Sequence, residues 1–217
     1  MSIKFENASA ATPPKTLSGA LGLVIIPDQA TIQRAYALAE EIMPRDAEYV
    51  LREGSLPHVT LYHGKLDRIP QETALETLQS LQSDLVGKRF ILNEIVTFGG
   101  KLIFWNVDPL CAGIEMLKEA HLKALSVANY LDRTSEAKAL SEEGLSLTDE
   151  ELENVRLFGH PLVRSLFTPH ITLGFQPRIS EVLANSLKYE WSFEVASVEL
   201  VKIGYPGRVE GVVNLVK

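Results

Sequence analysis

The pentapeptide Pro57-His58-Val59-Thr60-Leu61 returns almost unchanged as Pro169-His170-Ile171-Thr172-Leu173. The third position alone differs, and there one β-branched residue replaces another. Because the chain has only five histidines, a chance repeat of this pattern has odds on the order of one in a million. We therefore take the repeated motif as the feature around which the fold is organised.

Each motif is typical of a β-strand with one polar face. Successive side chains of a strand point to opposite faces, so His58 and Thr60 share one face while Val59 and Leu61 share the other. The same alternation holds for the second copy, and a proline is tolerated at the first residue of a strand. We expect two strands that are each backed by the hydrophobic core and present an imidazole and a hydroxyl on the opposite side.

The surroundings of the two motifs are duplicated as well. Each half of the chain runs strand, helix, motif strand, helix, strand, which indicates a repeat of a whole lobe. If the lobes pack about a pseudo-twofold axis, the two polar faces meet in a cleft. The expected strands are 21–26, 58–62, 90–98, 101–107, 171–175, 191–203 and 209–216, and the expected helices follow Asp28, Pro70, Asp108-Pro109 and Ser180.

Length and composition predict a single domain preceded by a flexible N-terminal tail. Of the 217 residues, 1–16 form a tail containing Pro13-Pro14, and 17–217 form one domain with an acidic insertion at about 132–160. Thr148 to Glu151 reads as a capping box, which predicts a short acidic helix. That insertion is either a solvent-exposed segment without a role in the site or a lid near the second motif. The net charge of −7 argues against an extended nucleic-acid surface.

Cysteine content and hydropathy indicate the cellular compartment in which the protein is expected. A single cysteine, Cys111, excludes an internal disulfide framework and a multi-cysteine zinc site. The N-terminus lacks the apolar core of a signal peptide, and the longest apolar run, 20–26, is too short to span a bilayer. We expect a cytoplasmic monomer without membrane association.

The residue types suit acid–base chemistry at a phosphodiester. One neutral imidazole can take a proton from the attacking water or hydroxyl while the other, as imidazolium, donates one to the leaving oxygen. The threonine hydroxyls can donate to the non-bridging oxygens, where charge accumulates. Each motif offers one nitrogen and no carboxylate at metal-ligand spacing, so no metal or cofactor is expected.

The paired motifs, the duplicated lobe and the length together resemble the 2H phosphoesterase superfamily, in particular its bacterial 2′-5′ RNA ligase and cyclic phosphodiesterase branch. The resemblance implies an α+β, bilobal fold in which pseudo-twofold-related lobes, each with an antiparallel β-sheet and flanking helices, enclose the active cleft. It also implies metal-independent hydrolysis of a 2′,3′-cyclic phosphate or a related 2′-linked ester of a nucleotide or RNA end. By that resemblance His58 and His170 are the acid–base pair, and Thr60 and Thr172 bind the phosphate.

The chain departs from the pattern of that branch at one point. An arginine often follows the second motif there, whereas this chain has Gln176. Arg164, Arg178 or Lys101 could substitute for it, or each could be a solvated surface cation. The departure puts a long RNA substrate in doubt more than it does the chemistry, and together with the acidic charge it leaves open a non-catalytic module that binds a nucleotide or RNA end. A further alternative is an RNA 2′-5′ ligase, which would need salt-dependent RNA binding that the net charge argues against.

Other side chains are secondary candidates. By alternation Tyr62 shares the face of His58 and could contact substrate, whereas His63 falls on the opposite face and reads as structural. Trp105 is either a core residue or a base-stacking one, and His160 could border the cleft from the end of the insertion. His121 continues an apolar helical stripe, which favours a packing role.

Overall fold

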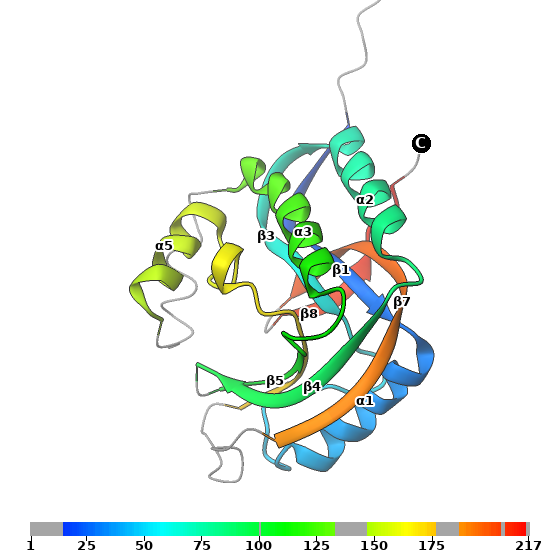
Figure 1. The fold of residues 1–217 in the computed structure, drawn as a ribbon. Helices are drawn as coiled ribbons and strands as arrows, with labels where there is room; N and C mark the ends of the chain where they lie inside the picture. The colour runs from blue at the N-terminus through cyan, green and yellow to red at the C-terminus, as the bar shows by residue number, and fades with distance from the viewer. Residues whose placement is uncertain (1–14, 100, 133–146, 177–186, 205–206, 216–217) are drawn as a thin grey trace, which may run out of the picture.

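The computed structural model describes residues 15–99, 101–132, 147–176, 187–204 and 207–215. The chain forms an α+β fold built on a large antiparallel sheet (Figure 1). Its elements in chain order are β1 (Thr16–Pro27), α1 (Gln29–Ile42), β2 (Tyr49–Val50), β3 (Val59–Pro70), α2 (Gln71–Leu85), β4 (Arg89–Phe98), β5 (Leu102–Val107), α3 (Ile114–Leu125), the 3₁₀ turn η1 (Ser126–Tyr130), α5 (Asp149–Phe158), the 3₁₀ turn η2 (Arg164–Leu166), β6 (His170–Phe175), β7 (Leu187–Gly204) and β8 (Arg208–Val212).

Strand pairing in the described residues closes on itself. The strand order is β1-β3-β6-β5-β4-β7-β8, and β1 also pairs with β7. The six strands from β1 to β7 in this order therefore form a closed hydrogen-bonded circuit. β7 makes this possible because it is long: its first part pairs with β4 and its later part with β1. The α+β class with antiparallel pairing is therefore confirmed, but the strands form one connected sheet rather than two separate ones.

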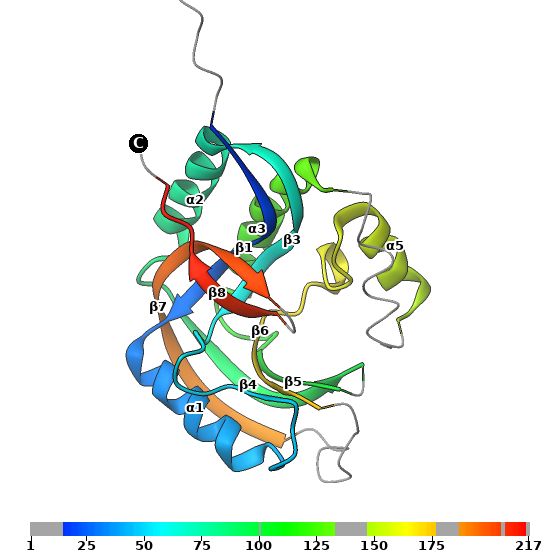
Figure 2. The same cartoon turned by 180° about the vertical axis from the view of Figure 1, so that it is seen from behind.

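Helices cover the sheet from two sides. α1 packs against β6 and β7, while α2 packs on β7 and α3 on β3 (Figure 1). α5 stands apart at one side of the molecule, which both views show (Figures 1 and 2). Most buried hydrophobic residues belong to one core cluster, and a smaller one lies between β1, β7 and β8. The four alternate motif residues Val59, Leu61, Ile171 and Leu173 are all buried in the main cluster, as predicted.

The third helix begins later than the sequence predicts. Asp108 does accept a hydrogen bond from the Leu110 backbone N–H, but this closes only a turn. Gly113 has a φ of +104°, which a residue inside a right-handed helix cannot adopt, so α3 begins at Ile114. Leu110, expected on the apolar stripe, is 90% exposed as a result.

The expected helices after Asp28 and Pro70 are present as α1 and α2, and the predicted capping box is present at the start of α5. In that box the Thr148 hydroxyl accepts from the Glu151 N–H while the Glu151 carboxylate accepts from the Thr148 N–H. The N-terminal tail as far as residue 14 and the helix expected from Ser180 lie outside the described residues. No helix in the described part is long and apolar enough to cross a membrane.

Asp28 ties the start of α1 to β7, and its removal should destabilise the protein. Its carboxylate accepts from the backbone N–H and the hydroxyl of Thr31 and from the Glu194 N–H. We predict that Asp28→Ala lowers the free energy of unfolding by about 1–2 kcal/mol, as measured by urea denaturation. Asp28→Asn, which keeps one acceptor oxygen, should lose less. Equal stability of the alanine variant and the parent would contradict this role.

Candidate functional site

The two motif strands touch at one residue pair. Val59 of β3 and Ile171 of β6 are antiparallel partners. Continuing that register by one residue in each direction sets His58 across from Thr172 and Thr60 across from His170. The two histidines are then diagonal neighbours on one face, at backbone separations of about 7–8 Å. The pairing thus brings two imidazoles and two hydroxyls from distant parts of the sequence to one place.

Both motif imidazoles are fixed by the same local hydrogen bond. Nδ1 of His58 lies 2.8 Å from the carbonyl oxygen of Leu56, and Nδ1 of His170 lies 2.6 Å from that of Thr168. A carbonyl can only accept, so each Nδ1 carries the proton and donates it. In both neutral rings Nε2 is consequently the unprotonated nitrogen, which can accept a proton or donate one after protonation.

The leucine that ends each motif is an extra residue in its strand. Along β1 the partner changes from Tyr62 to Thr60 in one step, which leaves Leu61 unpaired in a β-bulge. Along β5 the partner changes from Gly174 to Thr172, which leaves Leu173 in the corresponding position. The repeated sequence therefore folds into a repeated irregularity, and a bulge of this kind reorients the side chains that follow it.

Both bulged carbonyls accept hydrogen bonds from donors that lie outside β1 and β5. Nδ1 of His121, on α3, donates to the Leu61 carbonyl oxygen at 2.6 Å, and the Leu51 N–H donates to that of Leu173 at 2.9 Å. His121 also accepts at Nε2 from the Arg164 N–H at 2.8 Å. Its two nitrogens are thus committed to the backbone, which agrees with the packing role expected for this residue.

The bulge at Leu61 reverses the prediction for Tyr62 and His63. Gly22 and Val24 lie on the same face of β1, and their partners are His63 and Thr60, so His63 shares the face of the motif. Tyr62 instead turns into the core, where it is 2% exposed. Alternation failed here because it assumes a strand without an inserted residue.

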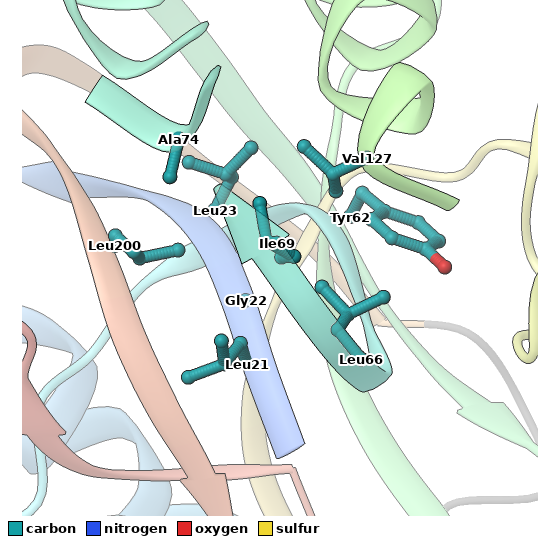
Figure 3. Close-up of a pocket in the computed structure, with 9 residues that line it drawn as sticks. All are labelled: Leu21, Gly22, Leu23, Tyr62, Leu66, Ile69, Ala74, Val127 and Leu200. Atoms are coloured by element: carbon teal, nitrogen blue, oxygen red, sulfur yellow. The ribbon is translucent and has the colours of Figure 1, made fainter. Parts of the chain in front are cut away.

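Tyr62 cannot contact a ligand in this arrangement. It lines a small apolar pocket between β1, β3 and η1, and its hydroxyl points away from the other lining residues (Figure 3). The hydroxyl donates to the Phe158 carbonyl oxygen at 2.7 Å, which fastens the end of α5 to β3. Since the pocket is lined by hydrocarbon and lies apart from the motif histidines, we assign it to packing.

Three further residues predicted to contact substrate have different environments. Trp105 is fully buried and donates from Nε1 to the Tyr189 carbonyl oxygen, so it is a core residue and not a base-stacking one. Arg164 is exposed, with its guanidinium 5.7 Å from the centre of the Phe158 ring. Arg178 lies outside the described residues.

His160 joins the motif face from the segment after α5. Its ring meets that of His63 edge to face, with 4.4 Å between the ring centres. Its Nδ1 accepts from the Leu162 N–H at 3.1 Å. Four of the five histidines of the chain therefore gather around one place, of which the sequence predicted His58, His170 and His160.

Two neighbours of His170 on β5 are not among the residues predicted from the sequence. The Phe104 ring stacks on the His170 ring, with 3.5 Å between centres and an interplanar angle of 16°. Asn106 is the cross-strand partner of His170, and its Oδ1 is buried without a hydrogen-bond partner in the described structure. The alternate spacing of Phe104 and Asn106 predicts that both side chains lie on one face of a strand. The pairing of β5 with β6, which places that face beside His170, cannot be predicted from the sequence.

Burial keeps these imidazoles neutral. Desolvation lowers the pKa of His170 to about 4, against the opposing effect of the Thr168 carbonyl, and His58 and His63 add repulsion. Burial and the neighbouring His58 lower the pKa of His63 to about 4 as well. Burial also lowers the pKa of His58, and it lowers that of His160 well below the usual range, with further repulsion from His63, His170 and His121. No carboxylate or fixed cation is among the causes of these four shifts.

The described residues contain no group of three or more histidine, cysteine, aspartate or glutamate side chains placed to hold a metal ion. The arrangement suits proton transfer: the Nδ1 bonds fix both motif rings and leave each Nε2 unprotonated in the neutral ring, and strand alternation sets Thr60 and Thr172 on the same face as the two histidines. An anion placed there would stabilise the imidazolium forms that burial disfavours.

Comparisons with known proteins support the fold. No family model matches the sequence, and no curated protein matches it either. Among solved structures, TT0787 of Thermus thermophilus has a TM-score of 0.52 and 16% identity, over 90% of this chain and 95% of that one. E. coli LigT, solved in complex with NADP+, has a TM-score of 0.51 and 15% identity, over 91% of this chain and 95% of that one. The chain thus has a LigT-like fold, which agrees with the α+β fold that the resemblance of the motifs implies.

The lowered pKa values predict acid sensitivity. A histidine whose pKa is about 4 when folded and about 6.5 when unfolded binds more protons in the unfolded chain, so its contribution to stability is full above pH 6.5 and declines as the pH falls toward 4. We expect urea denaturation to show falling stability from pH 7 to pH 5, and NMR to show His63 and His170 still neutral at pH 5.5. Titration of both rings near pH 6.5 would contradict the buried arrangement.

Proposed function

We propose that this protein is a metal-independent phosphodiesterase that hydrolyses a 2′,3′-cyclic phosphate, or a related 2′-linked phosphodiester, at the end of a nucleotide or RNA. One observation carries the proposal above the others: the two motif histidines have identical Nδ1 anchors on strands that meet at Val59 and Ile171. A duplicated anchor of this kind presents two equivalent Nε2 atoms, which is what removal and delivery of protons on opposite sides of one phosphorus requires.

In the proposed reaction, water attacks phosphorus in line with the leaving ribose oxygen. Nε2 of one motif histidine accepts the proton of the water as the new phosphorus–oxygen bond forms. Nε2 of the other, protonated beforehand, donates its proton to the ribose oxygen as that phosphorus–oxygen bond breaks. The product is a phosphate monoester, and the two imidazoles have exchanged protonation states, so solvent must restore them.

The hydroxyls and the neighbouring ring support this step. Thr60 and Thr172 lie on the face of the histidines and donate to the non-bridging oxygens, where charge grows in the transition state. Phe104 stacks on His170 and restricts rotation of its ring, while the Thr168 carbonyl fixes its tautomer. The pseudo-twofold, two-lobed cleft implied by the family resemblance is part of this proposal.

The fold neighbour and the charge of the chain support the proposed ligand class. LigT was solved with NADP+, a dinucleotide that carries a phosphate on a ribose 2′-oxygen, which supports a ribose phosphate as ligand here. The net charge of −7 favours a small ligand or an RNA end over a long nucleic acid, because binding many phosphates requires many cations. We therefore propose nucleotide-sized substrates.

Removal of either motif imidazole should abolish most of the activity. We predict that His58→Ala and His170→Ala each lower kcat for nucleoside 2′,3′-cyclic phosphates by about 10²–10⁴-fold, the range of general acid–base catalysis. Chelators should leave the parent protein fully active. The measurement is product formation from the four cyclic nucleotides by chromatography, with circular dichroism to show that the variants fold.

Tyr62→Phe is the matched control, since that hydroxyl is buried and bonds only to protein in this account. It should lower stability but keep kcat within about threefold, a change below one kcal/mol. Full activity in both alanine variants would exclude the site. Binding of nucleotides without turnover of any of them would instead indicate the non-catalytic module, and joining of RNA ends would indicate the ligase.

The buried imidazoles also predict a displaced pH profile. The kcat/KM profile reports the free enzyme, where one imidazole must be protonated although burial lowers the pKa of both. The protonated fraction falls as the pH rises above those lowered values, so kcat/KM should peak below pH 6.5. In the bound complex the phosphate stabilises the imidazolium, so kcat should peak at higher pH. Coincident profiles centred above pH 7 would contradict this.

A further inference from the structure

His63 and His160 form a second imidazole pair beside the motif histidines. Their rings meet edge to face, 4.4 Å apart at the centres, and both are partly exposed. Nδ1 of His160 accepts from the Leu162 N–H, so Nε2 of the neutral ring carries a proton that it can donate. Neither nitrogen of His63 has a hydrogen bond within the described structure. The pair therefore holds uncommitted donors and acceptors on the face that carries the motifs.

The fold does not require a histidine at position 63. In β6 the corresponding position, two residues beyond the bulge, is Phe175, which is 5% exposed. The facing residue Gly22 has little room for a side chain of its own, because an added Cβ would lie 3.0 Å from Ile203 and 3.1 Å from the Cβ of His63. The chain thus accommodates a polar ring where its own second copy of the motif has a hydrocarbon one.

The charged groups around the pair add little positive charge of their own. On β3, Lys65 shares the face of His63 but lies 3.1 Å from the Asp132 carboxylate. On β1 the facing residue is Gly22, and across the face lie His58 and His170. Near His160 stand His121, bonded at both nitrogens, and the exposed Arg164. Among the described residues, no lysine or arginine contributes to the pKa shifts of His63 and His160, so within that part of the chain the positive charge of this imidazole cluster comes from protons taken up by histidines.

We propose that the His63–His160 pair is an anion contact of the phosphodiester site, which takes up one proton as a phosphate ester binds and donates hydrogen bonds to its non-bridging oxygens. The proposal rests on the proposed function, in that it places the phosphate at the motif face. No bond is made or broken: an imidazole becomes imidazolium at the expense of solvent, and the anion supplies the stabilisation that burial withholds. Proton uptake then takes the place of a permanent cation.

The test is calorimetric binding of adenosine 2′-monophosphate to the full chain at pH 6.5. Titrations in two buffers of different ionisation enthalpy give the number of protons taken up. The double variant His63→Asn and His160→Asn should take up about one proton fewer and bind about tenfold more weakly, as expected for loss of a charge-assisted hydrogen bond. His63→Phe, which copies Phe175, should do the same. Lys118→Gln, which removes an exposed cation paired with Glu115 on α3, is the control and should match the parent.

Kinetics on a cyclic nucleotide separate the pair from the acid–base machinery. We expect the double variant to raise KM about tenfold while kcat stays within about threefold. Unchanged proton uptake and KM, or a fall in kcat alone, would overturn the inference while leaving the proposed function intact. If the parent binds with proton uptake that depends on His63 and His160 but hydrolyses nothing, the proposed function fails and the anion contact stands.

Discussion

The contact between Val59 and Ile171 is the constraint on which the site depends. Both side chains are fully buried, and burying a β-branched side chain of this size is worth about 1.5–3 kcal/mol. A slip of one residue would expose that hydrocarbon and bury the polar residues on either side. Hydrophobic burial on one face of the sheet therefore sets the register, and the register sets the histidines and threonines of the other face. The groups proposed for function are therefore positioned by buried residues of the opposite face.

Several features of this site could be predicted from the sequence because they obey local rules. The repeated pentapeptide identified both strands, alternation placed Val59 and Ile171 in the core, and the capping box of Thr148 fixed the start of α5. Tyr62 and His63 exchanged faces because of one inserted residue, Leu61. The adjacent apolar pair Leu61-Tyr62 followed by a polar residue was a signal of that phase change. The pairing of β5 with β6, which places Phe104 on His170, joins segments far apart and leaves no local signal.

The two β-bulges determine which side chains lie beside the motif histidines. In each motif the leucine has no partner in the ladder with β1 or β5. Its carbonyl accepts from His121 in β3, and in β6 it accepts from the Leu51 N–H that follows β2. As a result His63 lies on the same face as His58, whereas after the equivalent bulge in β6 the residue on that face is Phe175. The two copies thus share the groups proposed for acid–base catalysis and differ in what surrounds them. The two motifs are alike in sequence and in their Nδ1 hydrogen bonds, and the difference between their surroundings gives the site one side with additional imidazoles.

Convergence of the two motif imidazoles on a single phosphate is the central claim, and a crystal structure with adenosine 2′-monophosphate tests it most directly. We predict one phosphate with Nε2 of His58 and Nε2 of His170 both within hydrogen-bonding distance, about 2.7–3.2 Å, of its oxygens. The Nδ1 bonds to Leu56 and Thr168 should persist in the complex. A phosphate held by only one of these rings, or bound on another face of the sheet, would contradict the account.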